Sequence, residues 1–275
     1  MYEPGPVEQV MKSIAASRRY RSISAEFVRS IAVRELARHR SVKEAIKATK
    51  NKLHQAAGAY VAARIDYAAH LRQMRAARNR DELAAACARA MARHASSRER
   101  LPILPEFYAA TLGSLPPVRS VLDVACGLNP LAIPWMPLAE GCEYYACDIY
   151  HDMVEFLGEF LRLAGVAGRA QVCDVIARCP TQHVDVALLL KAIPCLEQVD
   201  PAAGARLLDS LDADHLLVSF PAHSLGGLRK GMPENYTAHF MDLIAGRGWG
   251  VRRFLFAGEL AFLVSRQCEN VSGSF

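Results

Sequence analysis

The chain has 275 residues, 52% of them hydrophobic, which is enough to bury the core of one large domain or two ordinary ones. No apolar run reaches the length of a bilayer span, and the N-terminus lacks the pattern of a secretory signal, so we expect a cytoplasmic protein and no membrane partner. The net charge of +5 is unevenly distributed, because residues 1–100 carry 21 Lys and Arg against 9 Asp and Glu, whereas residues 101–275 carry 12 against 19. This asymmetry favours a polyanionic partner for the first part over the alternative of ordinary solvated helix faces.

The eight cysteines form no C-x-x-C pair and have no histidines at zinc-ligand spacing. We therefore expect no metal site. Several of these cysteines lie in apolar runs, where Cys behaves as a small buried hydrophobe. Reduced thiols of this kind fit a cytoplasmic location.

The basic part begins with short amphipathic helices. Apolar residues between Val7 and Ile14 fit one helical face, and Ser24 is placed to cap a second helix. Ser41 and Glu44 form a capping-box pattern that begins a third helix. Like charges on one helix face repel each other unless an anion lies nearby, so we predict that this helix contacts a polyanion. The lysines that share the face are Lys43, Lys47 and Lys50.

The remaining part of the first hundred residues predicts two more helices, over residues 66–77 and 79–93. Residues 94–100 form a polar stretch without an apolar face, which we interpret as a connector. Another helix begins at Leu101 and ends near Gly113.

From residue 119 onward, strand-like runs alternate with helical ones, which predicts a mostly parallel sheet with helices on both faces. The expected strands are Ser120–Val124, Glu143–Cys147, Ala170–Cys173, Val184–Leu190, His215–Phe220, Val251–Phe256 and Leu260–Ser265. Only three residues separate the last two runs, which favours a hairpin over a crossover. Seven strands that end in a hairpin are the layout of Rossmann-like class I methyltransferases, so we expect this α/β fold with its last strand antiparallel.

Three strand ends carry residues suited to adenosine. Gly127 lies in a turn after the first strand and allows close approach of a ligand to the main chain. Asp148, after the second strand, can accept hydrogen bonds from both ribose hydroxyls, and Asp174, after the third, can accept one from an adenine amino group, with Val175 beside the ring. Each acid alone could be a helix cap, but the three together predict adenosine binding. The turn has no G-x-G-x-x-G pattern for a dinucleotide, so S-adenosylmethionine, which needs no phosphate site, fits better.

The end of the fourth strand bears on the target atom. The Asp/Asn-Pro-Pro-aromatic motif of enzymes that methylate exocyclic amines is absent between Leu188 and Cys195. Pro194-Cys195 resembles the nucleophile of cytosine-C5 methyltransferases, although a buried structural Cys is the more common case. A ring nitrogen such as guanine N7 needs only alignment with the methyl group and no general base.

Several motifs across the chain together resemble one family, the aminoglycoside-resistance methyltransferases that modify guanine N7 in the decoding A site of 16S rRNA. The two most specific are Cys126-Gly-Leu-Asn-Pro-Leu131 and Lys230-Gly-Met-x-x-Asn-Tyr236. Others include His94-Ala-Ser-Ser-Arg-Glu-Arg-Leu101 and Leu189-Leu-Lys-Ala-Ile-Pro-Cys-Leu-Glu197.

The resemblance implies roles for individual residues. Those that would bind S-adenosylmethionine are Tyr60, His94, Ser97, Arg100, Ala125, Gly127, Asp148, Asp174, Val175 and Leu190, with Arg100 on the carboxylate of the cofactor. Lys191 and Lys230 would face the target guanine. Residues 1–100 would form a helical domain that docks on the 30S subunit, and residues 101–275 the methyltransferase domain of a monomeric enzyme. Two alternatives stay open: cytosine-C5 methylation through Cys195, and a non-catalytic RNA-binding protein that retains the fold.

Overall fold

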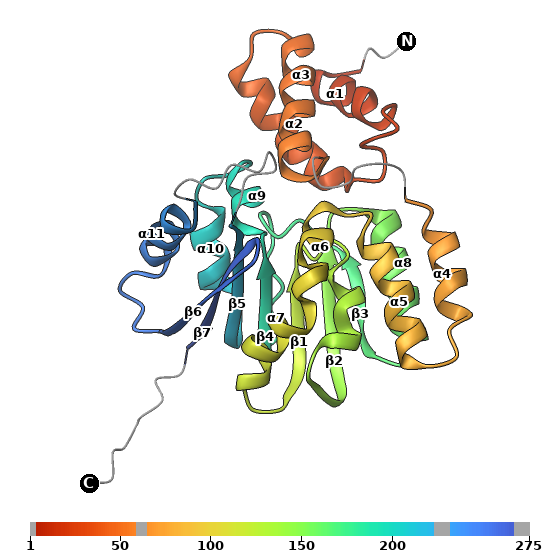
Figure 1. The fold of residues 1–275 in the computed structure, drawn as a ribbon. Helices are drawn as coiled ribbons and strands as arrows, with labels where there is room; N and C mark the ends of the chain where they lie inside the picture. Colours follow the sequence, from red (N-terminus) through yellow and green to blue (C-terminus); the bar gives the residue numbers. More distant parts are fainter. Residues whose placement is uncertain (1–3, 59–64, 223–231, 267–275) are drawn as a thin grey trace.

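The computed structural model describes residues 4–58, 65–222 and 232–266, and its centre is one seven-stranded sheet (Figure 1). The strands are β1 Val118–Val124, β2 Leu138–Asp148, β3 Ala167–Val172, β4 Val184–Leu190, β5 Ala213–Pro221, β6 Gly250–Phe256 and β7 Glu259–Ser265. They lie in the order β3-β2-β1-β4-β5-β7-β6, in which β1 to β5 pair in parallel and β7 runs antiparallel to both neighbours. The predicted sheet, with its terminal hairpin and antiparallel last strand, is confirmed.

Helices cover both faces of the sheet. One face packs against α4 (Tyr67–Arg75), α5 (Arg80–Met91), α7 (Leu104–Thr111), α8 (His151–Leu163) and the 3₁₀ segment η4 (Asn129–Trp135). The other face packs against α10 (Ala203–Ser210) and α11 (Met232–Ile244), and the short α9 (Ile193–Glu197) follows β4. Both faces of β1 are buried, with Val121 in one core and Leu122 in the other, and this fixes its register.

The first helices form a lobe with a core of its own above the carboxyl ends of the strands (Figure 1). It consists of α1 (Pro6–Ala15), α2 (Ala25–Arg38), α3 (Val42–Leu53) and a π-helical turn, η1 (His54–Gly58). The predicted caps are confirmed, since the side chains of Ser24 and Ser41 accept hydrogen bonds from the N–H groups of Phe27 and Glu44. We refer to residues 4–58 as the lobe.

The lobe is attached to the sheet beside two strand ends. A β-bridge joins Ile23 to Tyr150, just after β2, and the Ser22 hydroxyl donates to Asp152 over 3.0 Å. Lys52 donates to the carbonyl of Gln198, beyond β4, over 2.7 Å. The lobe therefore lies directly over the region where the predicted site residues meet.

The hydrophobic cores divide the basic residues 1–100 into two groups, although the charge count had treated them as one part. α4 and α5 belong to the core on the sheet face with α8 and η4, and not to the core of the lobe. The stretch that we interpreted as a connector is in fact a helix, α6 (Ala95–Arg100), whose inward side is polar. The apolar-periodicity criterion missed it for that reason. In the part of the chain that the structure describes, every helix is too short or too polar to cross a bilayer.

Candidate cofactor site

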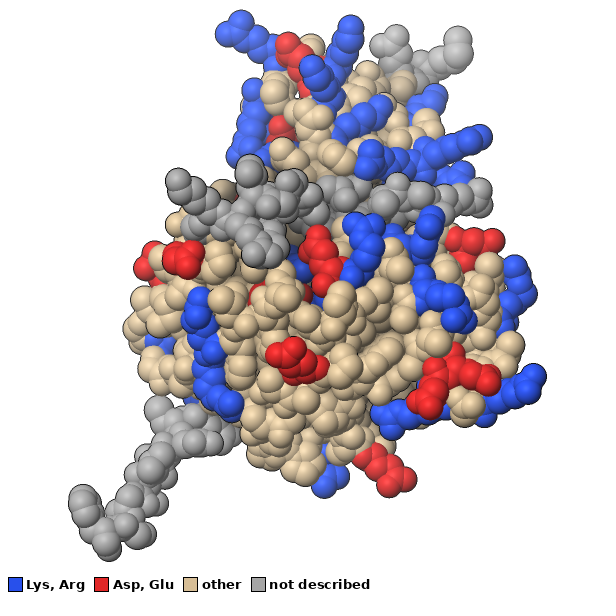
Figure 2. Space-filling model, in the orientation of Figure 1, with Lys and Arg blue, Asp and Glu red and all other residues tan. Residues whose placement is uncertain are grey.

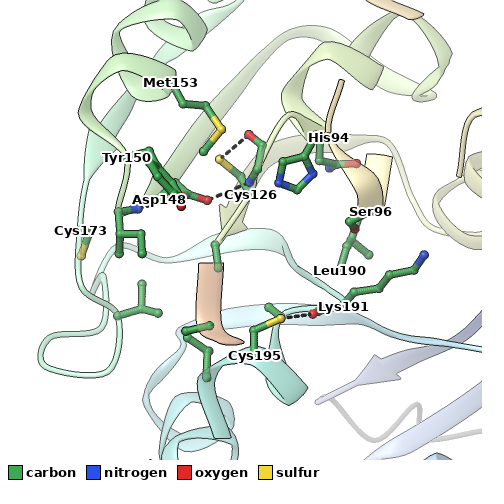
Figure 3. A pocket seen from close by; sticks show the side chains of 18 of the residues that line it. His94, Ser96, Cys126, Asp148, Tyr150, Met153, Cys173, Leu190, Lys191 and Cys195 are labelled. Atoms are coloured by element: carbon green, nitrogen blue, oxygen red, sulfur yellow. Dashed lines mark hydrogen bonds between the residues drawn. The ribbon is translucent and has the colours of Figure 1, made fainter. Parts of the chain in front are cut away.

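A pocket of about 860 Å³, counting its open mouth, lies between the sheet and the lobe (Figure 3). The lobe contributes Phe27 and Ala56 to its wall. The pocket brings together most of the residues predicted to bind the cofactor, namely His94, Ser97, Arg100, Ala125, Gly127, Asp148, Asp174, Val175 and Leu190. Tyr60 and Lys230 lie outside the described residues.

The turn after β1 is shaped by its backbone. Ala125 and Gly127 both have left-handed backbone angles, with φ of +50° and +52°. A Cβ at Gly127 would lie 2.8 Å from Cε1 of His94, so the imidazole occupies the space that a side chain would need. Glycine is favoured here by its φ, and the close approach of His94 excludes a side chain, which sets Gly127 apart from Ala125.

Two carboxylates mark the next two strands. Asp148, at the end of β2, accepts hydrogen bonds from the N–H of Gly127 over 2.9 Å and from that of Ile149 over 2.7 Å. Asp174 accepts from the N–H groups of Ile176 and Ala177. Burial raises the pKa of both carboxyls above its ordinary value, and the backbone donors oppose that rise. Asp174 therefore caps the turn that follows β3, whereas Asp148 does not cap α8, whose N-cap is Tyr150, and instead holds the turn at Gly127. Both acids line the pocket.

The polar side of α6 forms the opposite wall. His94, Ser97 and Arg100 are buried, and burial together with the neighbouring cations lowers the pKa of His94 to about 4. The imidazole is therefore uncharged at neutral pH. The charge of Arg100 is held by Glu259 on β7, with a shortest N–O distance of 2.6 Å, and its other amino group donates to Asn129. These contacts engage three of the five N–H donors of a guanidinium, which leaves donors for a ligand carboxylate.

A buried polar network below the pocket includes residues that the sequence did not single out. Asn129 accepts from Arg100 and Tyr108 and donates to Asp123, which also accepts from Tyr144 over 2.7 Å. Asn129 is part of the Cys126–Leu131 motif, so the sequence could have indicated that it belongs to the site. No motif marked Glu259, which follows the hairpin turn and therefore looked like a surface residue.

Lys191, which we expected to face the target guanine, is held by acidic side chains. Its ammonium lies 2.8 Å from a carboxylate oxygen of Glu99 and 3.3 Å from one of Glu259, and its side chain is buried. Its φ is +59°, and its N–H donates to Ser219. Figure 3 shows its side chain directed away from Asp148. A role in placing the target remains a prediction.

Cys195, the alternative nucleophile, lies on α9 at the pocket wall. Its thiol donates to the carbonyl of Lys191 over 3.3 Å (Figure 3).

The predicted RNA contacts lie apart from the pocket on α3, where Lys43 and Lys47 are exposed and Lys50 is half-buried.

The donor set of the pocket fits S-adenosylmethionine. Consecutive strand ends offer one carboxylate for the ribose and one for the adenine, the glycine turn admits a close backbone contact, and Arg100 on α6 keeps donors for a carboxylate. The uncharged His94 adds no cation beside a sulfonium. Fold and site together define a Rossmann-like methyltransferase that uses S-adenosylmethionine.

Comparisons with known proteins narrow this class. The profile of a family described as Ribosomal RNA methyltransferase (FmrO) matches residues 16–263. The chain is 44% identical, over 94% of both chains, to a protein of Frankia casuarinae named 16S rRNA (guanine(1405)-N(7))-methyltransferase. It is 37% identical to a protein of the same name from Micromonospora echinospora, over 94% of this chain and 97% of the relative. The crystal structure of the 16S rRNA methyltransferase RmtF with S-adenosyl-L-homocysteine superposes with a TM-score of 0.83 at 33% identity, covering 97% of this chain and all of that one. The chain belongs to the FmrO family of ribosomal RNA methyltransferases.

Proposed function

We propose that this chain transfers the methyl group of S-adenosylmethionine to N7 of a guanine in the decoding A site of 16S rRNA, in the assembled 30S subunit, and thereby confers aminoglycoside resistance. The observation that carries the proposal is the 44% identity, along 94% of both chains, to a relative named for methylation of guanine 1405 at N7. The pocket supports the cofactor half of the proposal.

Methyl transfer to guanine N7 requires the protein only to align the base with the methyl group of the cofactor. The cofactor supplies a methyl group on a positively charged sulfur. Guanine N7 already carries a lone pair, so no side chain has to remove a proton. Asp148 would hold the ribose, Asp174 the adenine, and Arg100 on α6 the amino-acid end. His94 stays neutral, since its pKa is about 4, and so does not repel the sulfonium.

Lys191 is a positioning residue in this scheme. Its ion pairs with Glu99 and Glu259 fasten the left-handed turn between β4 and α9, where the pocket wall passes from Leu190 to Cys195. A non-glycine residue in this conformation is strained and needs such support. The turn would then present a fixed surface to the target guanine.

The basic first part would dock the enzyme on its substrate. Lys43, Lys47 and Lys50 on α3 would contact rRNA phosphates, Lys230 would lie near the target, and residues 1–100 would provide the docking surface. We place the protein in the cytoplasm, where ribosomes are found, and expect it to act as a monomer.

Primer extension tests the proposal directly. Purified 30S subunits are treated with the protein and S-adenosylmethionine and then with borohydride and aniline, which cleave RNA at N7-methylguanine. One new stop in the decoding site is expected. Asp148→Ala protein serves as the matched control and should give no stop. Incorporation of labelled methyl without a stop would move the target to another atom and refute N7 methylation.

The same assay separates the alternatives. Cys195 lies at the pocket wall, which keeps cytosine-C5 methylation open. Cys195→Ser should keep N7 transfer, whereas loss of all transfer in this variant would favour the thiolate mechanism. Absence of cofactor binding to the native protein would favour the non-catalytic reading.

A further inference from the structure

Three exposed arginines lie on or near the segment that provides His94, Ser97 and Arg100 to the pocket, and none of them has been given a role of its own above. Arg89 is on the last turn of α5, Arg93 follows that helix, and Arg98 is on α6. Figure 2 shows Lys and Arg side chains gathered over this part of the molecule, below the lobe and on the same face as cations of the lobe. We refer to Arg89, Arg93 and Arg98 as the arginine row.

The positive charge of the row is only partly balanced. Arg93 and Arg89 both lower the pKa of His70 on α4, in addition to the effect of burial, and Arg98 contributes to the low pKa of His94. Asp66 acts in the opposite direction on His70, but its carboxylate caps α4. Glu99, the nearest acid in sequence, pairs with Lys191. Arg89 also donates to Gln73, a neutral partner. Arg89 and Arg93 are like charges that both act on His70, and like charges repel each other unless an anion lies between them.

Along residues 93–100, exposed arginines of the row alternate with residues that line the pocket. His94, Ser97 and Arg100 point inward and are at most 9% exposed, whereas Arg93 and Arg98, their neighbours in sequence, are exposed. Arg93 and Arg98 are therefore exposed cations directly adjacent in sequence to the wall of the cofactor pocket. The lysines of α3 are on the lobe and lack this placement.

A base that reacts must leave its stack, and its own phosphates then remain at the mouth of the pocket. We propose that Arg93 and Arg98, assisted by Arg89, bind the rRNA phosphates on either side of the target nucleotide and stabilise its extruded state. The inference rests on the proposed function. It assigns the lysines of α3 to docking and the arginine row to the step between docking and transfer. Arginine suits this role because its planar fork can pair with two phosphate oxygens.

The test uses the full-length protein with Arg93→Gln and Arg98→Gln, separately and together. Arg119→Gln is the matched control, since Arg119 is an exposed arginine at the start of β1, at the opposite end of that strand from the pocket. Three quantities are measured: cofactor affinity, 30S affinity as a function of salt, and the single-turnover rate of methyl transfer at saturating 30S.

The double variant should keep its cofactor affinity, which also verifies that it is folded. The slope of log affinity against log salt should fall by about 0.7–0.9 per arginine. The single-turnover rate should fall at least tenfold, and Arg119→Gln should match the native protein in all three measurements.

An unchanged salt slope would overturn the phosphate contact, and an unchanged rate at saturating 30S would overturn its placement beside the target. Binding to anionic phospholipid vesicles that the double variant loses, with the 30S slope unchanged, would assign the row to a membrane surface and refute the inference. Failure of the native protein to methylate 30S subunits would instead refute the proposed function, so the two failures are distinguishable.

Discussion

Gly127→Ala probes the turn on which the pocket depends. The native residue has φ +52°, a conformation that L-residues rarely adopt, and a Cβ would lie 2.8 Å from the ring of His94. Gly141 provides a matched control. Its φ is +72°, but a Cβ there would meet no atom within 4 Å. Both substitutions therefore strain the backbone, and only the one at Gly127 also displaces a wall of the pocket.

The backbone strain should lower the free energy of unfolding by about 1–2 kcal/mol in each variant. For a chain of this size that corresponds to a decrease in Tm of roughly 2–8 °C, measured by differential scanning fluorimetry. At Gly127 the imidazole must also move, and the N–H that donates to Asp148 moves with the turn. Loss of one hydrogen bond to a charged group weakens an interaction by about 1.5–3 kcal/mol, so we expect the affinity for S-adenosylmethionine to fall at least tenfold.

Isothermal titration calorimetry with S-adenosylmethionine decides the outcome. Gly141→Ala should bind the cofactor like the native protein despite its lower Tm. If Gly127→Ala also binds with native affinity, the turn does not shape the cofactor site, and the roles assigned to Gly127 and to its hydrogen bond with Asp148 are wrong.

Three further predictions concern other residues. Asp148→Ala removes the carboxylate that we propose accepts from the two ribose hydroxyls, so calorimetry should show cofactor affinity at least a hundredfold weaker. Native affinity would refute the assignment. Burial raises the pKa of Asp123 to about 7, so the folded chain holds the proton of this carboxyl more tightly than the unfolded chain does. The folded chain therefore loses stability as the pH rises from about 4 to about 7. The difference from an unfolded pKa of about 3.9 corresponds to about 4 kcal/mol, so urea unfolding should show that Asp123→Asn gains more stability relative to the native protein at pH 8 than at pH 5. An equal gain at both values would contradict the buried carboxylate as its source. Reversal of Lys43, Lys47 and Lys50 to Glu should leave cofactor affinity unchanged and reduce both the 30S affinity and its salt slope, measured by filter binding; an unchanged slope would exclude α3 from the interface.

The sequence predicted the sheet well because its signals are local. Each strand is a short apolar run bounded by polar or turn residues, and the three-residue link before Leu260 left only a hairpin possible. The same holds for the caps at Ser24 and Ser41, where one side chain satisfies a backbone N–H three residues later. Gly127 and Asp148 could also be placed, since parallel strands bring their carboxyl ends to one edge.

α6 was missed because its stabilising contacts are distant in sequence. A surface helix reveals itself by apolar residues at helical spacing, whereas α6 buries serine, histidine and arginine. Those side chains are tolerated inside only because partners from other elements meet them there. The motif around His94 could therefore suggest a binding role, but not the helix that positions it.

The buried ion pair beneath the pocket could be predicted even less, because its two residues are far apart in the sequence. Arg100 and Glu259 are 159 residues apart, and their contact exists only because β7 lies next to β5 and brings its first residue under α6. Removing one partner of a buried pair leaves an uncompensated charge, which destabilises a protein by about 3–5 kcal/mol. Glu259 also pairs with Lys191, so a change at any of the three alters the charge balance of the other two. Loss of activity on substitution of Arg100 would consequently mix lost folding stability with lost cofactor binding. Unfolding and cofactor affinity should therefore be measured separately for Arg100 and Glu259 changed singly and together, because the cycle gives the coupling between the two charges in each quantity.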